Sequence, residues 1–425
     1  MLKKIPVEDV RVGMHLHALE GAWLDQPFWK NRFTIDDPED LRKLRGSKVR
    51  EVWIDVAKGI DAADAAALAG VEVPPAATAP EASAASAASA QAGAAGMQAR
   101  GDAPVRPARS AMSDELRQAA AVCQRSRQQM VSMFREARLG KAIDAEACEP
   151  LVEEISASVM RNPGALVSLA RLKTQDDYTF MHSVAVCALM VALARELGFD
   201  DEARRAAGLA GLVHDLGKAM MPLAVLNKPG KLSDEEFAIM RTHPERGHEL
   251  LQEGRGASEQ TLDVCLHHHE RVDGSGYPHR LSGEALTVLA RMGAICDVYD
   301  AITSNRPYKA GWDPAESIAR MASWKGHFDP ALFKAFVKSL GIYPVGSLVR
   351  LHSGRLAVVV EHDAQALTAP TVKVFFSTKS NLPIPVQRLD LAGSSDRIVG
   401  RESPAKWGFK HLEELWIDGQ VPRAA

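Results

Sequence analysis

Histidines and aspartates occur along this sequence in a pattern that suits a metal site. His214 stands directly before Asp215, and a second pair, His268 and His269, follows further along the chain. An imidazole next to a carboxylate can bind one metal ion while the carboxylate is shared with a second ion. The pattern therefore indicates a metal-dependent hydrolase with two ions bridged by Asp215. Its predicted ligands are His182, His214, Asp215, His243, His268, His269 and Asp297.

The ligand types narrow the choice of metal. Neutral imidazole with a few carboxylates suits divalent iron, manganese or zinc better than magnesium. None of the five cysteines stands among the motif positions. We predict two divalent ions as cofactors, iron or manganese ahead of zinc, nickel or cobalt.

The candidate ligands are far apart in the sequence, so folding must bring them together. From about residue 112 to 341, apolar residues recur at helical spacing, as in Leu151, Ile155 and Val159. The stretch from His182 to Leu193 is so rich in apolar residues that it indicates a buried helix. This part of the chain is predicted to be all-α and to carry every candidate ligand.

Segments with a different pattern flank the helical region. Residues 49–56 alternate with strand period, and Asp37-Pro38 is typical of a capped helix start, so a small α+β module is predicted. After Tyr343-Pro344, apolar runs separated by turns predict a β-hairpin or three-stranded sheet, and Trp407 to Trp416 a last helix. We expect a structural role for this C-terminal part.

A segment dominated by alanine, serine, proline and glycine separates the first two parts. It has few large side chains to bury, so packing cannot offset the entropy lost on ordering it. The chain is therefore predicted to be multidomain: a small α+β N-terminal module at 1–60, a flexible linker at 61–110, an all-α helical core at 111–345 and a small β-rich C-terminal extension at 346–425.

Composition limits the classes of function. The formal net charge of −3 gives no general attraction to nucleic acid or to an anionic membrane, so a phosphate ligand must meet local positive charge. The cysteines show neither zinc-type pairs nor disulfide spacing, which favours a reducing compartment. No uninterrupted apolar stretch approaches the roughly 20 residues of a spanning helix. The N-terminus turns acidic before a signal core could form. We predict a cytoplasmic protein with no nucleic-acid partner and no membrane span.

Several motifs together resemble the HD-GYP branch of the HD phosphohydrolase superfamily. They occur in the family's order between about residues 112 and 345. Residues 1–60 are similar to an uncharacterised module that often precedes HD-GYP domains. The motifs are Asp177 to Ser183, Leu212 to Lys218, Leu226 to Leu232, His243, His268-His269-Glu270 through Gly276-Tyr277-Pro278, and Asp297 to Ala301 through Arg306-Pro307-Tyr308.

The resemblance implies a phosphodiesterase that hydrolyses the bacterial messenger cyclic di-GMP to linear pGpG, with a further cut to GMP left open. It implies a hydroxide activated by two metals, with Asp215 and Lys218 as catalytic residues, and it matches all seven candidate ligands to the family's metal ligands. Lys218 stands four residues after His214, so both are expected on one helical face. Some members hold a third metal with a glutamate where this chain has Tyr178, so two metals are expected here.

The resemblance also implies substrate contacts. Lys218, Arg306 and Lys309 match phosphate-binding positions, and they would supply the local positive charge that the net charge does not. Tyr277 belongs to the Gly-Tyr-Pro loop and is expected to line the substrate pocket.

Other polar residues near the motifs keep two interpretations. His267 is expected either to be structural or to support a ligand. Glu270 either orients a histidine or is a solvated helix carboxylate, and Asp300 either supports Asp297 or makes an ordinary helix hydrogen bond. The basic turn from Lys228 to Lys231 either contacts phosphate or is only solvated.

Two other functions fit part of the pattern. A different HD enzyme, one that hydrolyses a nucleoside triphosphate or an alarmone, would share the histidines and aspartates but would not need Gly276-Tyr277-Pro278. A cyclic di-GMP sensor or scaffold that docks diguanylate cyclase domains is also compatible with the motifs. The intact ligand set favours catalysis, with cyclic di-GMP as substrate, diguanylate cyclase domains as candidate partners and a homodimer as a candidate assembly.

Overall fold

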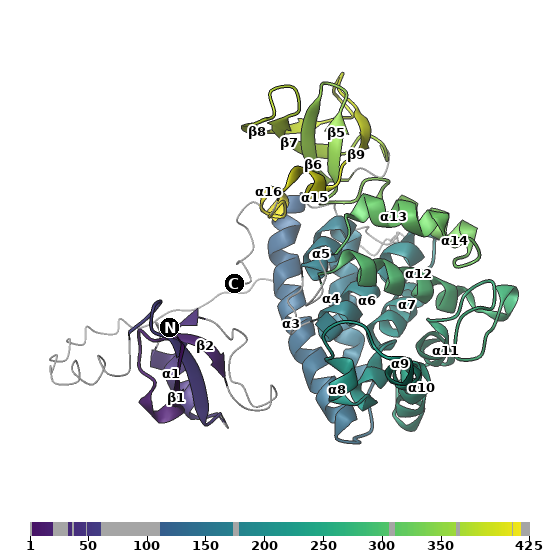
Figure 1. Cartoon of the computed structure of the whole chain (residues 1–425). Coiled ribbons are helices and arrows are strands. Elements are labelled where there is room, and N and C mark those ends of the chain that lie inside the picture. The colour runs from purple at the N-terminus through teal and green to yellow at the C-terminus, as the bar shows by residue number, and fades with distance from the viewer. Residues whose placement is uncertain are drawn as a thin grey trace, which may run out of the picture. The chain divides into compact units, whose positions relative to one another are not determined.

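The computed structural model describes residues 2–19, 33–35, 38–47, 49–60, 111–172, 178–305, 311–362, 366–409 and 411–417. These residues divide between two compact units, one within Met1–Asp102 and one within Ala103–Pro422 (Figure 1). The segment predicted as a linker, 61–110, lies outside the described residues, so its flexibility remains a prediction.

The described residues of the N-terminal unit form a four-stranded antiparallel sheet and one α-helix. Val52 and Ile54 are fully buried and alternate with more exposed neighbours, as the strand period predicted. Helix α1 begins at Pro38, where the sequence indicated a helix start, so the predicted α+β architecture of this module is confirmed. The strands β1 (Leu2–Pro6), β2 (His15–Leu19), β3 (Phe33–Thr34) and β4 (Glu51–Asp55) pair in the order β1-β4-β2-β3, with η1 (Val7–Asp9) and α1 (Pro38–Arg45) between them.

The second unit is mostly helical and contains all seven candidate ligands. This confirms the predicted all-α core. The α-helices of its helical core are α3 (Met112–Arg138), α4 (Glu149–Arg161), α5 (Pro163–Arg171), α6 (Tyr178–Glu196), α7 (Asp201–Val213), α8 (Leu223–Leu226), α9 (Asp234–Met240), α10 (His243–Glu253), α11 (Glu259–His267), α12 (Val288–Thr303), α13 (Pro314–Ser323) and α14 (Pro330–Leu340). Its 3₁₀ helices are η3 (Glu146–Cys148), η4 (Leu216–Met220) and η5 (Gly283–Ala285).

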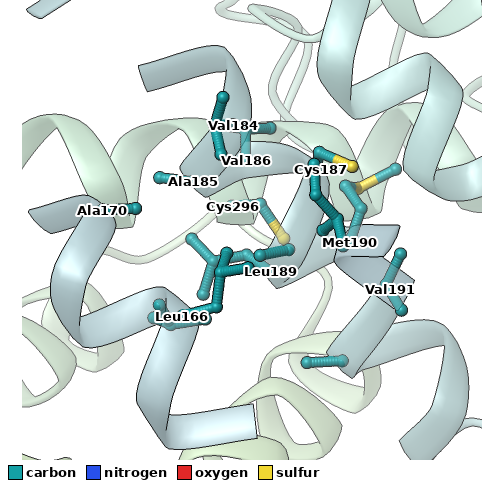
Figure 2. Close-up of a cluster of buried hydrophobic side chains, with 14 of the residues drawn as sticks. Leu166, Ala170, Val184, Ala185, Val186, Cys187, Leu189, Met190, Val191 and Cys296 are labelled. Atoms are coloured by element: carbon teal, nitrogen blue, oxygen red, sulfur yellow. The ribbon is translucent and has the colours of Figure 1, made fainter. Parts of the chain in front are cut away.

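Helix α6 is the central helix of this unit. Every residue from Val184 to Ala194 is at most 2% exposed, because α3, α5, α7, α12 and α14 all pack against it. Figure 2 shows Cys187 of α6 in the same apolar cluster as Leu166 of α5 and Cys296 of α12. By length and composition α6 could cross a membrane, but 83% of its apolar window is buried inside the protein, which is typical of a core helix. The predicted buried helix is confirmed.

A glycine lets α7 lie close to α6. A Cβ atom at Gly211 would lie 2.9 Å from Met190 Cγ and 3.1 Å from the Cys187 backbone nitrogen, closer than ordinary packing allows. Because the two helices can approach this closely, the end of α7 lies beside the first turns of α6. The ring centroids of His182 and His214 are therefore only 5.1 Å apart.

The C-terminal part is a five-stranded antiparallel sheet, so its predicted β-rich fold is confirmed but the predicted number of strands is wrong. The strands that the sequence did not reveal are β8 and β9. β8 is an edge strand that contains Pro383 and Pro385, and prolines are tolerated at an edge although they argue against a central strand. The strands β5 (Leu348–Leu351), β6 (Arg355–Glu361), β7 (Thr371–Ser377), β8 (Leu382–Asp390) and β9 (Ile398–Arg401) pair in the order β8-β7-β6-β5-β9.

The predicted last helix from Trp407 to Trp416 is wrong. Helix α15 (Pro404–Trp407) ends before Gly408, whose φ of +69° is left-handed, and α16 (Glu414–Ile417) is a separate helix. Glycine adopts this conformation at little cost and so ends the first helix. Trp416 and Phe376 belong to the same buried cluster as the helices, so the sheet and the helical core pack together.

Candidate metal centre

The seven predicted ligands meet in the interior of the helical unit. They come from α6, α10 and α12 and from the residues that follow α7 and α11. Their ligand atoms form two groups, and within each group all atoms lie within 4.8 Å of one another. The two groups share Asp215, the residue that was predicted to bridge two ions. One group is Asp215, His243, His268 and His269, and the other is His182, His214, Asp215 and Asp297.

Backbone carbonyls orient three of the imidazoles. The Nδ1–H of His214 donates to the Gly211 carbonyl at 2.7 Å. The Nδ1–H of His243 donates to the Met240 carbonyl at 2.7 Å, and His268 donates to a carbonyl three residues earlier at 2.9 Å. Because a carbonyl oxygen can only accept, each Nδ1 carries the proton and each Nε2 keeps its lone pair. The three Nε2 lone pairs are therefore free to bind a cation.

A carboxylate orients the fourth imidazole, that of His182. Its Nδ1 lies 2.6 Å from Asp300 Oδ2, and its Nε2 lies 2.9 Å from Asp297 Oδ1. The other carboxylate oxygen of Asp300 accepts a hydrogen bond from Ser304 Oγ at 3.2 Å. The hydrogen bond with Ser304, four residues on, is the ordinary helix hydrogen bond that one interpretation of Asp300 predicted. Neither interpretation included the contact with His182, because that contact joins α12 to α6.

Two buried atoms at the centre make no hydrogen bond with the described residues. They are His214 Nε2 and Asp215 Oδ1. A buried polar atom without a partner costs roughly 1–3 kcal/mol, so such atoms indicate a ligand that satisfies them. In addition, His243 Nε2 and His268 Nε2 face each other at 3.3 Å. A divalent cation accepts lone pairs from all of these atoms, so the donor set fits metal ions.

Charges around the centre keep its aspartates ionised. Burial raises the pKa of Asp215, but the ammonium group of Lys218 and the contact with His182 outweigh burial and hold that pKa well below its ordinary value. The pKa of Asp297 is also held well below its ordinary value, because the hydrogen bond with His182 outweighs burial. Two ionised carboxylates in a buried site need positive charge nearby, and metal ions would supply it.

The imidazoles differ in their charge state. Burial lowers the pKa of His243 and of His268, and it holds the pKa of His269 well below its ordinary value, so these rings are neutral near pH 7. Burial also disfavours the charged form of His182, but its three carboxylate neighbours outweigh burial and raise its pKa to about 10. A metal ion bound by His182 would therefore take the place of a proton.

Comparison with known proteins gives the same assignment as the site. Residues 2–148 match a domain of unknown function, DUF3391, and residues 158–332 match the HD domain. The chain is 54% identical over 419 residues to the cyclic di-GMP phosphodiesterase PA4108 of Pseudomonas aeruginosa, an alignment that covers 98% of this chain and 96% of that protein. The chain belongs to the HD-GYP family of cyclic di-GMP phosphodiesterases. The family prediction from the motifs is thus confirmed.

Other relatives differ in their substrates. The cyclic di-GMP phosphodiesterase response regulator RpfG of Xanthomonas campestris is 41% identical over 151 residues, which cover 34% of this chain and 39% of that protein. The 3'3'-cGAMP-specific phosphodiesterase 1 of Vibrio cholerae is 37% identical over 190 residues, which cover 44% of this chain and 42% of that protein. These two substrates differ in one nucleobase, guanine in the first and adenine in the second.

The HD motif of this HD-GYP chain does not lie on one continuous helix. Helix α7 ends at Val213, and Lys218 lies in the following 3₁₀ helix η4. The expectation that His214 and Lys218 share one helical face is therefore wrong, because the chain tightens after Asp215 to pass α10. Lys218 still reaches the site, since its Nζ forms an ion pair with Asp215 Oδ2. Lys218 is 19% exposed, so its ammonium group is available to a ligand.

The Gly-Tyr-Pro loop places Tyr277 directly against the centre. The ring of Tyr277 stacks on that of His269 with centroids 4.8 Å apart and an angle of 30° between the planes. Burial raises the pKa of the Tyr277 phenol, so it stays protonated. In the other ligand group, the ring of Tyr178 stacks on that of His182, with centroids 5.8 Å apart and an angle of 6° between the planes.

Glu270 holds the end of this loop. It is only 2% exposed, and its Oε1 accepts the backbone N–H of His279 at 2.7 Å. It is thus not a solvated helix carboxylate, and among the described residues it forms no hydrogen bond with a metal-binding histidine. His267 points away from the centre, with its Nδ1 2.7 Å from Asp263 and its Nε2 3.0 Å from His279 Nδ1, which favours the structural interpretation.

The structure describes only part of the other predicted phosphate contacts. Arg306 and Lys309, predicted to bind phosphate, lie outside the described residues. In the basic turn, Lys228 forms an ion pair with Glu236 at 2.5 Å, which gives that lysine a structural contact.

Replacing Asp300 should weaken metal binding. Without the carboxylate, the His182 ring loses the partner of its Nδ1 and can turn away from the centre, so we expect Asp300→Ala to lower metal affinity by about 10- to 100-fold. Asp300→Asn keeps an oxygen that accepts from Nδ1 and should lose less. Competition of each purified variant with a chelator for Mn²⁺ measures the difference. Equal affinity in wild type and Asp300→Ala would show that this contact does not support the metal.

Proposed function

We propose that this protein is a metal-dependent phosphodiesterase that hydrolyses cyclic di-GMP to pGpG, with GMP as the product of a second cut. The observation that carries the proposal is the pair of ligand groups that share Asp215. The 54% identity to a cyclic di-GMP phosphodiesterase over nearly the whole chain supports the substrate.

The cofactors in this proposal are two divalent ions, iron or manganese. The seven-residue donor set, His182, His214, Asp215, His243, His268, His269 and Asp297, would hold them, with Asp215 shared. Imidazole nitrogen with carboxylate oxygen suits these metals. When bound, such ions supply a hydroxide at neutral pH and positive charge for the phosphoryl oxygens. A third ion is not proposed, because the phenol of Tyr178 is a poorer ligand than a carboxylate.

Two residues of the chain have the proposed catalytic roles. Asp215 is fully buried and has one oxygen toward each ligand group, since Oδ1 lies 3.2 Å from His243 Nε2 and Oδ2 lies 3.3 Å from His182 Nε2. It thus fixes the spacing of the two halves of the site. Lys218 forms an ion pair with Asp215 and is partly exposed, so its ammonium can donate to a substrate phosphate at the edge of the site. Tyr277, Arg306 and Lys309 complete the proposed substrate contacts.

Replacing Lys218 should separate catalysis from metal binding. Lys218→Met keeps the length of the side chain but removes its charge, and we expect kcat to fall by roughly 100- to 1,000-fold, as for other donors aimed at a developing negative charge. Metal content should stay the same, because no ligand is changed. Lys338→Met, which removes a lysine paired with Glu196 on the surface, is the matched control. Joint loss of metal and activity in Lys218→Met would instead assign Lys218 to metal binding.

The function itself is tested with anaerobically purified full-length protein. Metal analysis comes first, followed by incubation with cyclic di-GMP or a nucleoside triphosphate and chromatography of the products. Formation of pGpG from the cyclic substrate alone, with about two ions per chain, supports the proposal. Hydrolysis of the triphosphate would indicate another HD nucleotide hydrolase. Saturable binding of cyclic di-GMP without turnover under iron, manganese or zinc would indicate a sensor or scaffold.

Location and assembly are part of the same proposal. We place the enzyme in the cytoplasm, with diguanylate cyclase domains as candidate partners and a homodimer as the candidate assembly. The described chain has one helix apolar enough to span a membrane, and that helix carries His182 within the helical core.

A further inference from the structure

The guanidinium group of Arg241 lies at the edge of the site. Arg241 directly follows α9 and stands two residues before His243. Its Cζ lies 4.7 Å from the centroid of the Tyr277 ring and 5.9 Å from that of the Phe237 ring. Among the described residues, its side chain donates no hydrogen bond and forms no ion pair. Its five N–H donors are therefore available to a ligand.

Tyr277 connects this guanidinium to the metal centre. The Tyr277 ring contacts both groups, since it lies 4.7 Å from Arg241 Cζ and stacks on the His269 ring with centroids 4.8 Å apart. Phe237, one turn before Arg241, is 48% exposed. Aromatic rings rather than carboxylates thus hold the guanidinium, and a carboxylate partner would have used the same donors that a ligand needs. The arrangement places a rigid, planar set of donors beside the reacting site.

We propose that Arg241 recognises a guanine base of the substrate and sets the preference for guanine over adenine. The inference deepens the proposed function and rests on it. Guanine has two acceptors, N7 and O6, on one edge, and a guanidinium can donate to both. Adenine has an amino donor in place of O6, so it faces the donors of Arg241 with a donor of its own.

The base is also the part of the substrate that distinguishes these relatives. One relative is a cyclic di-GMP phosphodiesterase and another is specific for 3'3'-cGAMP, and the phosphates of the two substrates are the same. A residue that bound only phosphate could not tell them apart. Arg241 contacts Tyr277 of the Gly-Tyr-Pro loop but is not a metal ligand, so it can affect substrate choice without a change in metal binding.

The test compares the metal-loaded, full-length wild type with Arg241→Ala and Arg241→Lys. Each is assayed with cyclic di-GMP, 3'3'-cGAMP and cyclic di-AMP. Arg241→Ala should raise KM for cyclic di-GMP on the order of 10- to 100-fold with little change in kcat, and should leave KM for cyclic di-AMP within about two-fold. Arg241→Lys keeps the charge but not the planar set of donors, so it should not restore the preference. Arg246→Ala, which removes an exposed arginine paired with Glu249 on α10, is the control.

Two results would overturn this inference. An equal rise in KM for all three nucleotides would show a phosphate contact, and unchanged KM values at wild-type metal content would show no contact. If the wild type binds but does not cleave cyclic di-GMP, the proposed function fails separately. In that case the dissociation constants of the wild type and Arg241→Ala are compared for the same three nucleotides. A loss of affinity for cyclic di-GMP but not for cyclic di-AMP would support the role of Arg241, and an equal loss for all three would contradict it. A wild type that binds none of them overturns both proposals.

Discussion

Replacing Asp215 with asparagine is expected to abolish hydrolysis of cyclic di-GMP and to remove metal from the protein. The substitution keeps the shape of the side chain but removes the charge that both ligand groups share. An amide has one oxygen in place of two, so it cannot offer an oxygen ligand to both groups. Its NH₂ group would instead donate to a histidine Nε2 lone pair that a metal ion needs. The loss of both ions should lower kcat/KM by at least about 1,000-fold.

Metal analysis of the variant beside the wild type checks this result. Asp114→Asn, which changes an exposed aspartate paired with Arg117, controls for the loss of one negative charge. Because Asp215 carries the charge that balances Lys218 inside the protein, the variant should also unfold at a lower temperature when no metal is added. Two ions per chain and a wild-type rate in Asp215→Asn would disprove the shared-ligand arrangement.

The seven candidate ligands could be predicted from the sequence because metal chemistry restricts them to few residue types. His214-Asp215 and His268-His269 stand in compact motifs, and a histidine such as His182 in an apolar helix gains significance beside them. The all-α core was equally predictable, since a buried helix such as α6 is apolar on every side. Both predictions use properties that a single residue or a short segment carries by itself.

The contacts that orient the ligands could not be predicted in the same way. Asp300 binds His182 across two helices, and that contact depends on how α6 and α12 pack. The carbonyl groups of Gly211 and Met240 have no residue-specific signal, although each stands three residues before its histidine at a helix end. No motif in the sequence distinguishes Arg241 from other arginines, because its position depends on how Tyr277 of the Gly-Tyr-Pro loop packs against it. These features arise from backbone geometry and from packing between distant segments.

The structure also explains why the HD motif contains a glycine, and it makes Gly217 a sensitive position. A Cβ atom at Gly217 would lie 1.8 Å from the His243 carbonyl oxygen and 2.5 Å from the Gly247 backbone nitrogen. Both neighbours are backbone atoms, so no side-chain rotation can relieve the contact. The 3₁₀ helix η4 and helix α10 can cross at this point only because both residues are glycines.

Gly217→Ala is therefore expected to push η4 and α10 apart and to disrupt the site. His243 is the first residue of α10, while Asp215 and Lys218 flank Gly217, so the separation would draw His243 away from the shared carboxylate. We expect a loss of roughly 1–3 kcal/mol or more in the free energy of unfolding, as for overpacked cores, together with loss of metal. Urea unfolding and metal analysis measure the two effects.

Gly400→Ala is the matched control, because a Cβ atom at Gly400 in β9 meets nothing within 4 Å. It adds the same methyl group to the same unit, so any loss that it shares with Gly217→Ala comes from the substitution itself and not from the crossing of η4 and α10. Wild-type stability and metal content in Gly217→Ala would mean that this crossing is not what holds His243 against Asp215. A stable Gly217→Ala variant that has lost metal would show that the crossing serves the metal centre more than the fold.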